Sequence, residues 1–341
     1  MPNSSFKKSA LLVLVLSIVF LLCWEYYWHS SGYVLGYNDD DALWCRNRAM
    51  VYEPADKATV FIGSSRMKFD VDIPTWETIT GEKAVQLSIA GSNPRAALVN
   101  LGEDEKFKGK LVVDVTEGLF FSTWEDEKLT SHLKYLKEAT PSQKVSAQLS
   151  FALEHKLLFL DQELFSLNAL LTRLYLHDRK GVRGDVPWPT KFTTTNFRRQ
   201  EIMTNEFVKD TTLQRRVTDI WTMFGALDKY HGVTRDTLQK IFDEVKTAVA
   251  KIKARGGNVI FTRTPSSGGY WANEPLQHPR AEYYDRLPAI THCGSVHFKD
   301  YPDTKDFICP EWSHLSRPEA EQYTKALIGH LKEQHWFANA R

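Results

Sequence analysis

The sequence has 341 residues, enough for one large domain or two small ones. Its 43 Lys and Arg residues nearly cancel its 42 Asp and Glu residues, which excludes the strongly basic balance of a nucleic-acid-binding protein. Hydrophobic residues make up 43% of the chain and aromatic residues 12%, so a sizeable core is expected.

The first segment of the chain has the pattern of a membrane anchor. Lys7 and Lys8 precede an apolar run over residues 10–24, and an aromatic cluster follows it. A span needs about 20 apolar residues, and the aromatic cluster extends this run into the far interface of a bilayer. We therefore expect residues 1–28 to form a cytoplasmic tip and an uncleaved signal anchor that contacts lipid through residues 10–28. The positive charge before the run predicts that everything after it lies outside the cytoplasm.

A cleaved signal peptide is the main alternative to an anchor. Its nearest small-residue candidate for cleavage, residues 30–32, lies beyond the bulky aromatic cluster, which is a poor setting for cleavage. A lipoprotein signal requires a small residue before Cys23, and Leu22 is not small. Both alternatives still predict export.

After an expected linker at residues 29–57, β-rich apolar runs alternate with helical patterns. The expected strands are residues 60–62, 83–90, 110–115 and 258–262. The expected helices are residues 74–79, 95–101, 145–176, 206–226, 234–254 and 319–331. Strands that alternate with helices predict an α/β fold with a parallel sheet.

Residues 124–231 are rich in helical patterns, with an expected loop at residues 177–195, so we expect them to be a helical insertion. The insertion divides the α/β domain into a first part, residues 58–123, and a second part, residues 232–341. The apolar faces of its helices are expected to be ordinary core. A face that lies on a membrane or docks a partner is the alternative. Residues 271–310 have no clear periodicity and are expected to be largely loop.

The four cysteines, Cys23, Cys45, Cys293 and Cys309, show neither CxxC nor zinc-site spacing. Cys293 and Cys309 flank one loop, and they are either a disulfide or two free thiols.

The residues with the clearest chemical potential follow the first strand. Gly63 ends the strand, and Ser64 and Ser65 follow it at once, where an open α/β sheet presents its reactive groups. A serine hydroxyl becomes a nucleophile when an imidazole takes its proton, and a carboxylate normally orients that imidazole. Glu311 and His314 stand three residues apart in a loop before the last helix. The structural alternative is a turn that only caps a helix.

An oxyanion needs hydrogen-bond donors from other strand ends. Gly91 offers a backbone N–H after the second strand, and the side chain of Asn93 is a further donor.

Together these motifs resemble the SGNH (GDSL-like) hydrolase superfamily, and more closely its membrane-anchored bacterial members that act on cell-envelope polymers. Gly63-Ser64-Ser65 stands where that family has Gly-Asp-Ser, so the resemblance implies that Ser65 is the nucleophile. Gly91 matches the oxyanion glycine of the second block. The block at residues 311–316 matches the terminal Asp-x-x-His-Leu block, which implies His314 as the base. The family implies a three-layer, flavodoxin-like domain, and the resemblance covers roughly residues 58–120 and 256–332.

The sequence departs from the family pattern in two places. The orienting acid is Glu311 instead of Asp, so Asp303 and Asp306 are alternatives for that role. The third block normally carries an Asn as oxyanion donor, and residues 116–117 are Thr and Glu instead. Asn93 or Arg263 would then fill the place of that donor.

The resemblance implies a serine esterase or O-acyltransferase that forms an acyl-Ser65 intermediate. Its expected substrates are acyl esters, above all O-acetyl groups, of an exported cell-envelope polysaccharide. A multipass membrane acyltransferase is an expected partner, and the expected location is the outer side of the cytoplasmic (inner) membrane, facing the periplasm. Hydrolysis and transfer both remain open. The alternative is a catalytically silent subunit that assembles a complex or binds carbohydrate. We expect no cofactor and no metal, because Glu311 and His314 lack companion ligands and no HExxH motif is present.

Overall fold

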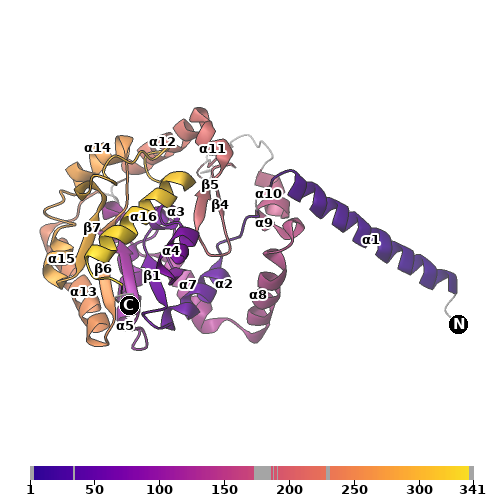
Figure 1. Ribbon diagram of the computed structural model, residues 1–341, viewed down its shortest axis with the longest axis horizontal. Helices are drawn as coiled ribbons and strands as arrows, with labels where there is room; N and C mark the ends of the chain where they lie inside the picture. The colour runs from indigo at the N-terminus through magenta and orange to yellow at the C-terminus, as the bar shows by residue number, and fades with distance from the viewer. Residues whose placement is uncertain are drawn as a thin grey trace. The chain divides into compact units, whose positions relative to one another are not determined.

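The computed structural model describes residues 4–33, 35–172, 186, 188, 189, 191–227 and 231–337. The chain forms two compact units, one from Met1–Asn38 with Thr140–Lys180 and the other from Asp39–Ala139 with Gly181–Arg341. This division differs from the expected one, because the larger unit includes residues 39–57 of the expected linker and most of the expected insertion, 124–231. Figure 1 shows the elements of both units in chain order.

The larger unit is built on a five-stranded sheet whose neighbouring strands are all parallel. Its strands are β1 (Ala58–Ile62), β2 (Lys83–Gln86), β3 (Lys110–Asp114), β6 (Asn258–Arg263) and β7 (Gly294–His297). The spatial order β2-β1-β3-β6-β7 is the flavodoxin-like order of a doubly wound sheet. The expected α/β fold with a parallel sheet is confirmed. A separate antiparallel pair joins β4 (Thr193–Thr195) and β5 (Glu201–Met203).

The helices of this unit connect and cover the strands. They are α2 (Asp41–Ala49), α3 (Ser65–Asp70), α4 (Ile73–Thr80), α5 (Pro94–Glu103), α6 (Glu117–Phe120), α7 (Glu127–Glu138), α11 (Asn205–Lys209), α12 (Thr211–Gly225), α13 (Arg235–Ala254), α14 (Gly268–Gln277), α15 (Arg286–Thr291) and α16 (Arg317–Glu333). Short 3₁₀ turns lie at Met50–Tyr52 and Phe298–Asp300. The ends of α4 illustrate why the helices stop where they do. Asp72 accepts the N–H of Thr75 at one end, and Gly81 adopts a left-handed conformation at the other.

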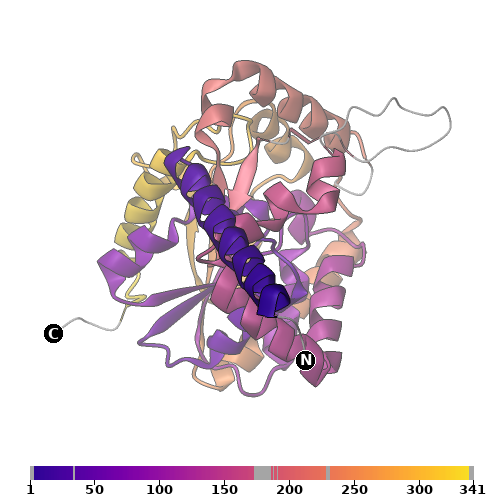
Figure 2. The same cartoon turned by 90° about the vertical axis from the view of Figure 1, so that its right-hand side faces the viewer.

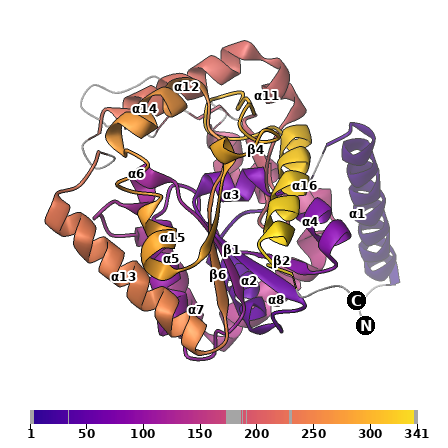
Figure 3. The same ribbon diagram turned by 60° about the vertical axis from the view of Figure 1, so that its left-hand side comes forward.

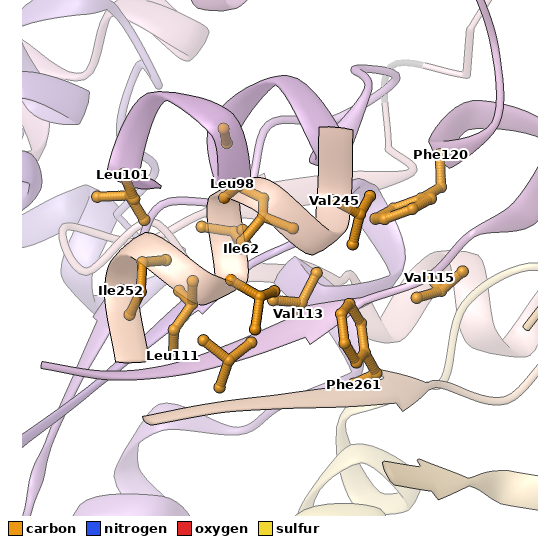
Figure 4. Packing of buried hydrophobic residues seen from close by; sticks show 14 of the residues in the cluster. Ile62, Leu98, Leu101, Leu111, Val113, Val115, Phe120, Val245, Ile252 and Phe261 are labelled. Atoms are coloured by element: carbon orange, nitrogen blue, oxygen red, sulfur yellow. The ribbon is translucent and has the colours of Figure 1, made fainter. Parts of the chain in front are cut away.

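Alternate residues of the strands point to opposite faces of the sheet, and helices cover both faces. On one face Ile62, Leu111 and Val113 pack with α5 and α13, and Figure 4 shows side chains of these helices lying over the strands. On the other face Phe61 and Val112 pack with α4 and α16. Figure 3 shows the two helical layers on either side of the strands. Burial of each such side chain stabilises the fold by about 1.5–3 kcal/mol.

Several boundaries differ from those expected. The expected strand 83–90 is shorter, since β2 ends at Gln86, although the N–H groups of Leu87 and Ile89 still donate to Phe61 and Gly63. The expected helix 206–226 is divided into α11 and α12. The expectation that residues 271–310 are largely loop is wrong, since they contain most of α14, all of α15 and the edge strand β7. Four residues that begin with Gly294 are too few for a strand pattern to stand out. The expected linker contains α2, whose Trp44 is buried and donates its indole N–H to the carbonyl of Leu87 at 3.2 Å.

The cysteines are free thiols. Cys293 packs against the core on the α13 face of the sheet, and Cys309 is buried in the core on the α16 face. The sheet therefore separates the two residues, which rules out the disulfide alternative in this structure.

The smaller unit consists of helices. They are α1 (Ser4–Ser30), α8 (Pro141–Glu154), the 3₁₀ turn η2 (Leu158–Leu160), α9 (Gln162–Phe165) and α10 (Leu167–Thr172). The expected helix 145–176 is thus broken into short pieces, and its residues 173–176 lie outside the described residues. Within α1, Phe6–Ser30 contains an 18-residue window with a mean hydropathy of 2.2 and is long and apolar enough to cross a membrane. Figure 2 shows α1 as one unbroken helix.

Candidate active site at the end of strand β1

The turn that follows β1 is unusually tight. A Cβ at Gly63 would lie 2.5 Å from the Cβ of Met67 and 2.9 Å from the Cβ of Asp114, so only glycine fits. The chain then enters α3, whose first residue is Ser65. The helix that follows β1 covers one face of the sheet and the helix before β3 covers the other, which makes this the topological switch point of the sheet. Ser65 therefore lies where doubly wound sheets place their sites.

Three side chains predicted from the sequence meet at this point. The Oγ of Ser65 lies 2.8 Å from Nε2 of His314, and Nδ1 of His314 lies 2.9 Å from Oε1 of Glu311. Glu311 and His314 are almost completely buried, whereas Ser65 is partly exposed. A carboxylate accepts hydrogen bonds, so Nδ1 carries the proton and Nε2 is left as the acceptor that faces Ser65.

Glu311 is the acid that contacts the imidazole. Its Oε1 also accepts the backbone N–H of His314 at 2.6 Å. The two alternatives, Asp303 and Asp306, are exposed, and Asp303 instead lies 3.0 Å from Nε2 of His330.

The loop that carries Glu311 and His314 is held by its neighbours. Trp312 has a positive φ of 78°, and its indole fills the space beside Gly268 and Gly269. A Cβ at Gly268 would lie 2.2 Å from Cδ1 of Trp312, and a Cβ at Gly269 would lie 2.7 Å from Cζ3. The double glycine after β6 thus accommodates the indole of Trp312, a residue that lies between Glu311 and His314 in the sequence.

A buried carboxyl joins this loop to the helix of Ser65. Asp70, in the last position of α3, accepts the backbone N–H of Leu315 at 2.9 Å. Burial raises the pKa of Asp70 well above its usual value, although the hydrogen bond from Leu315 opposes the shift. The contact fixes the distance between the element that carries the serine and the loop that carries the histidine.

Aromatic side chains surround the imidazole. Phe69 stacks on His314 with ring centroids 4.2 Å apart, and Trp221 meets the imidazole edge-on at 5.8 Å. The indole N–H of Trp221 also donates to Oε2 of Glu311. The ring centroids of Phe192 and His314 are 6.4 Å apart. Phe192 and Trp221 come from the segment that was expected to be an insertion, and no spacing in the sequence connects them to residues 90 and more positions away.

We predict that Trp221→Phe lowers the turnover of an ester substrate about tenfold. The substitution keeps an aromatic ring but removes the donor to Glu311, and a hydrogen bond to a charged group contributes about 1.5–3 kcal/mol. The measurement is the initial rate with a chromogenic ester. Trp336→Phe is the matched control, because the buried Trp336 indole has no hydrogen-bond partner among the described residues. Equal rates in both variants would contradict a role for the Trp221 donor.

The expected oxyanion residues have different surroundings. The N–H of Ile89 donates to the carbonyl of Gly63 at 3.2 Å, so the chain runs on beside the end of β1 to Gly91, which is exposed and has a φ of 67°. Asn93 instead caps α5: its Oδ1 accepts the N–H of Arg95, and its Nδ2 donates to Ser122. The N–H of Ser65, in the first turn of α3, is a donor that helix geometry leaves without an intrahelical partner.

Arg263 is not in a position to bind a substrate, and this part of the sequence prediction is wrong. Its guanidinium is fully buried and forms ion pairs with Glu117 at 3.1 Å and Glu274 at 2.5 Å. Glu274 also pairs with Arg66 at 2.5 Å, and Nε of Arg66 donates to Ser313 at 3.2 Å. Burial alone would raise the pKa of Glu274, but the two arginines outweigh it and lower that pKa to about 2. Arg66 and Ser313 adjoin Ser65 and His314 in sequence, so the ion-pair network holds in place the two segments that carry these site residues.

Thr116 and Glu117, which stand at the position of the third sequence block, also have partners within the fold. Oγ1 of Thr116 lies 2.9 Å from Oγ of Ser64, and Glu117 is the partner of Arg263. Ser64 is thus a structural neighbour of Ser65.

In the part of the chain that the structure describes, no three His, Cys, Asp or Glu residues are grouped so that they could hold a metal ion. No family model matches the sequence, and no curated protein matches it.

Proposed function

We propose that this protein is a membrane-anchored, SGNH-like serine esterase or O-acyltransferase. The observation that carries the proposal is the continuous chain of contacts from the Ser65 hydroxyl through His314 to Glu311. Such a chain activates a serine for attack on an acyl ester. The placement of Ser65 at the switch point of a doubly wound sheet supports it further.

The first half of the reaction acylates the serine. Nε2 of His314 takes the proton of Ser65 as Oγ attacks the ester carbonyl, and the carboxylate of Glu311 stabilises the imidazolium that forms. The backbone N–H groups of Ser65 and Gly91 are the proposed donors to the oxyanion. The tetrahedral intermediate then expels the alcohol, which leaves with the proton from His314, and acyl-Ser65 remains.

The second half of the reaction frees the serine. Water or a sugar hydroxyl loses its proton to His314 and attacks acyl-Ser65, and the proton returns to Ser65 as the acyl group departs. The resemblance to anchored envelope proteins and the apolar α1 favour O-acetyl groups of an exported polysaccharide as the substrate. We place the catalytic domain on the periplasmic side of the cytoplasmic membrane, beside a multipass acyltransferase that supplies or receives the acyl group.

A group of aromatic rings near the site, with Trp188 exposed and Trp221 and Tyr270 partly buried, fits a sugar-bearing substrate. Trp188 is 40% exposed and stacks on Phe192, with ring centroids 6.0 Å apart. Trp221 and Tyr270 continue this aromatic group, since their ring centroids are 5.8 Å apart. Flat apolar rings of this kind pack on the apolar faces of sugars and on acyl chains, and they reduce access of water to an acyl-enzyme.

A catalytically silent assembly or carbohydrate-binding subunit is the second candidate. It is favoured by the third block, where Thr116 and Glu117 are bound to Ser64 and Arg263 and supply no oxyanion donor. A fluorophosphonate probe separates the two candidates, because it labels only an activated serine. We expect stoichiometric labelling of the full-length protein in detergent, located by peptide mass spectrometry at Ser65. Folded protein that stays unlabelled would support the silent subunit.

A further inference from the structure

The smaller unit presents apolar side chains to its surroundings. On α8, Val145, Leu149 and Leu153 recur at every fourth residue and are 60%, 61% and 50% exposed. On α10, Leu167, Leu170 and Leu171 lie at helical spacing and are 48–73% exposed. Single exposed leucines are common in soluble proteins, but two helices of one unit that each expose a row of apolar residues mark an interaction surface. We call these six residues the collar face.

The collar face belongs to the same unit as the apolar helix α1, and specific contacts join them. The carboxylate of Glu25 accepts the backbone N–H groups of Leu158 at 2.8 Å and Phe159 at 3.1 Å. Glu25 thus provides hydrogen-bond acceptors for the free backbone N–H groups at the start of η2, the turn that connects α8 to α9. A carboxylate near the end of an apolar helix is costly unless it is bonded in this way.

A second contact is aromatic. Phe165, the last residue of α9, packs against Trp24 and Trp28 of α1, with ring centroids 5.9 Å and 5.3 Å apart. Trp and Tyr residues at the end of a membrane helix lie at the level of the lipid headgroups. Because η2 and α9 touch this part of α1, they lie at the same level, and α8 and α10 directly precede and follow them in the chain.

We propose that the collar face lies in the outer boundary of the bilayer that α1 crosses, with its leucines among the upper parts of the acyl chains. Interfacial helices bury an apolar face about 5–10 Å into that boundary. The short helices of the smaller unit then lie in the membrane interface around the end of the single span α1. Their contacts with Glu25, Trp24 and Trp28 fix the rotation of α1 about its axis. This inference rests on the proposed anchoring by α1 but not on the proposed chemistry at Ser65.

Site-specific photocrosslinking to lipid tests this proposal. A diazirine-bearing phenylalanine analogue replaces Leu149 or Leu167 in the full-length protein, which is reconstituted into vesicles of phosphatidylethanolamine and phosphatidylglycerol. Leu14 in α1 is the positive control. Gln148 is the matched control, since it is exposed on the same helix about 100° around the axis from Leu149. Adducts are identified by mass spectrometry of the purified protein.

We expect phospholipid adducts at positions 149 and 167 at yields close to those at position 14 and at least fivefold above those at position 148. Crosslinks from positions 149 and 167 to another part of the chain or to a second copy would overturn the proposal, as would reaction with water alone. Missing lipid adducts at position 14 as well would overturn the anchoring of α1 itself.

Discussion

Replacement of Ser65 by Ala is expected to abolish ester turnover, with a fall in kcat of at least about 10,000-fold, since loss of one member of a catalytic triad has effects of this size. The Oγ of Ser65 is the one hydroxyl within hydrogen-bond distance of Nε2 of His314 among the contacts of the described chain. Without it, His314 activates only water, and no acyl-enzyme forms. The measurement is the hydrolysis of a chromogenic acetyl ester by the full-length protein in detergent.

Ser64→Ala is the matched control for this prediction. Ser64 is the adjacent serine, but its hydroxyl is bonded to Thr116 within the fold. Its removal is expected to cost about 1 kcal/mol of stability and to leave turnover within a few-fold of the wild type. Turnover that survives in Ser65→Ala, or that is lost only in Ser64→Ala, would refute the assignment of the nucleophile.

The sequence predicts the sheet and the triad because both depend on local patterns. Short apolar strands that each end in a turn, followed by helical spacing, require a parallel sheet, and a parallel sheet brings the ends of its strands together. Ser65 follows β1 directly, and the spacing of Glu311 and His314 lets one loop place both next to it. The two serines, Glu311 and His314 are therefore recognisable from their positions along the chain, whereas the choice of Ser65 over Ser64 comes from the resemblance to the SGNH superfamily.

Other parts of the site depend on contacts that the sequence does not contain. Arg263 is the last residue of β6 and thus stands near a strand end as Ser65 does, but the buried carboxylates of Glu117 and Glu274 hold its guanidinium inside the fold. Trp221 reaches Glu311 from a helix that has only the periodicity of an amphipathic surface helix. Whether a polar side chain faces a substrate or a buried partner is decided by packing, and periodicity carries no information about it.

The same reasoning explains the difference between the expected insertion and the observed units. A Leu-rich helical pattern is compatible with core, membrane or interface, since all three select apolar residues at the same spacing. Residues 141–172 share a unit with α1, whereas α11 and α12 share a unit with the sheet. The helices that were expected as one insertion between residues 124 and 231 therefore belong to two different units.

Glu311→Gln is expected to lower kcat about 1,000- to 10,000-fold while KM changes little, the pattern expected when the group that orients a catalytic imidazole is lost. The carboxylate accepts the backbone N–H and Nδ1–H of His314 and the indole N–H of Trp221. A glutamine side chain has one oxygen and one NH₂ group, so its NH₂ group faces either the two donors of His314 or the indole N–H of Trp221. In the first orientation the ring loses the preference for the tautomer whose Nε2 accepts the proton of Ser65. In both orientations the imidazolium loses its counter-charge.

Asp303→Asn and Asp306→Asn are the matched controls, because they make the same chemical change at the two exposed acids of the same loop region. Both controls are expected to keep turnover within twofold of the wild type, and Ser65 in Glu311→Gln is expected to react slowly with a fluorophosphonate probe. A thermal melt separates this effect from unfolding, since a variant that melts within a few degrees of the wild type has kept its fold. Full activity in Glu311→Gln combined with a loss in Asp306→Asn would transfer the orienting role to Asp306. Equal losses in all three variants would show that the charge of the loop, and not a contact with His314, controls the reaction.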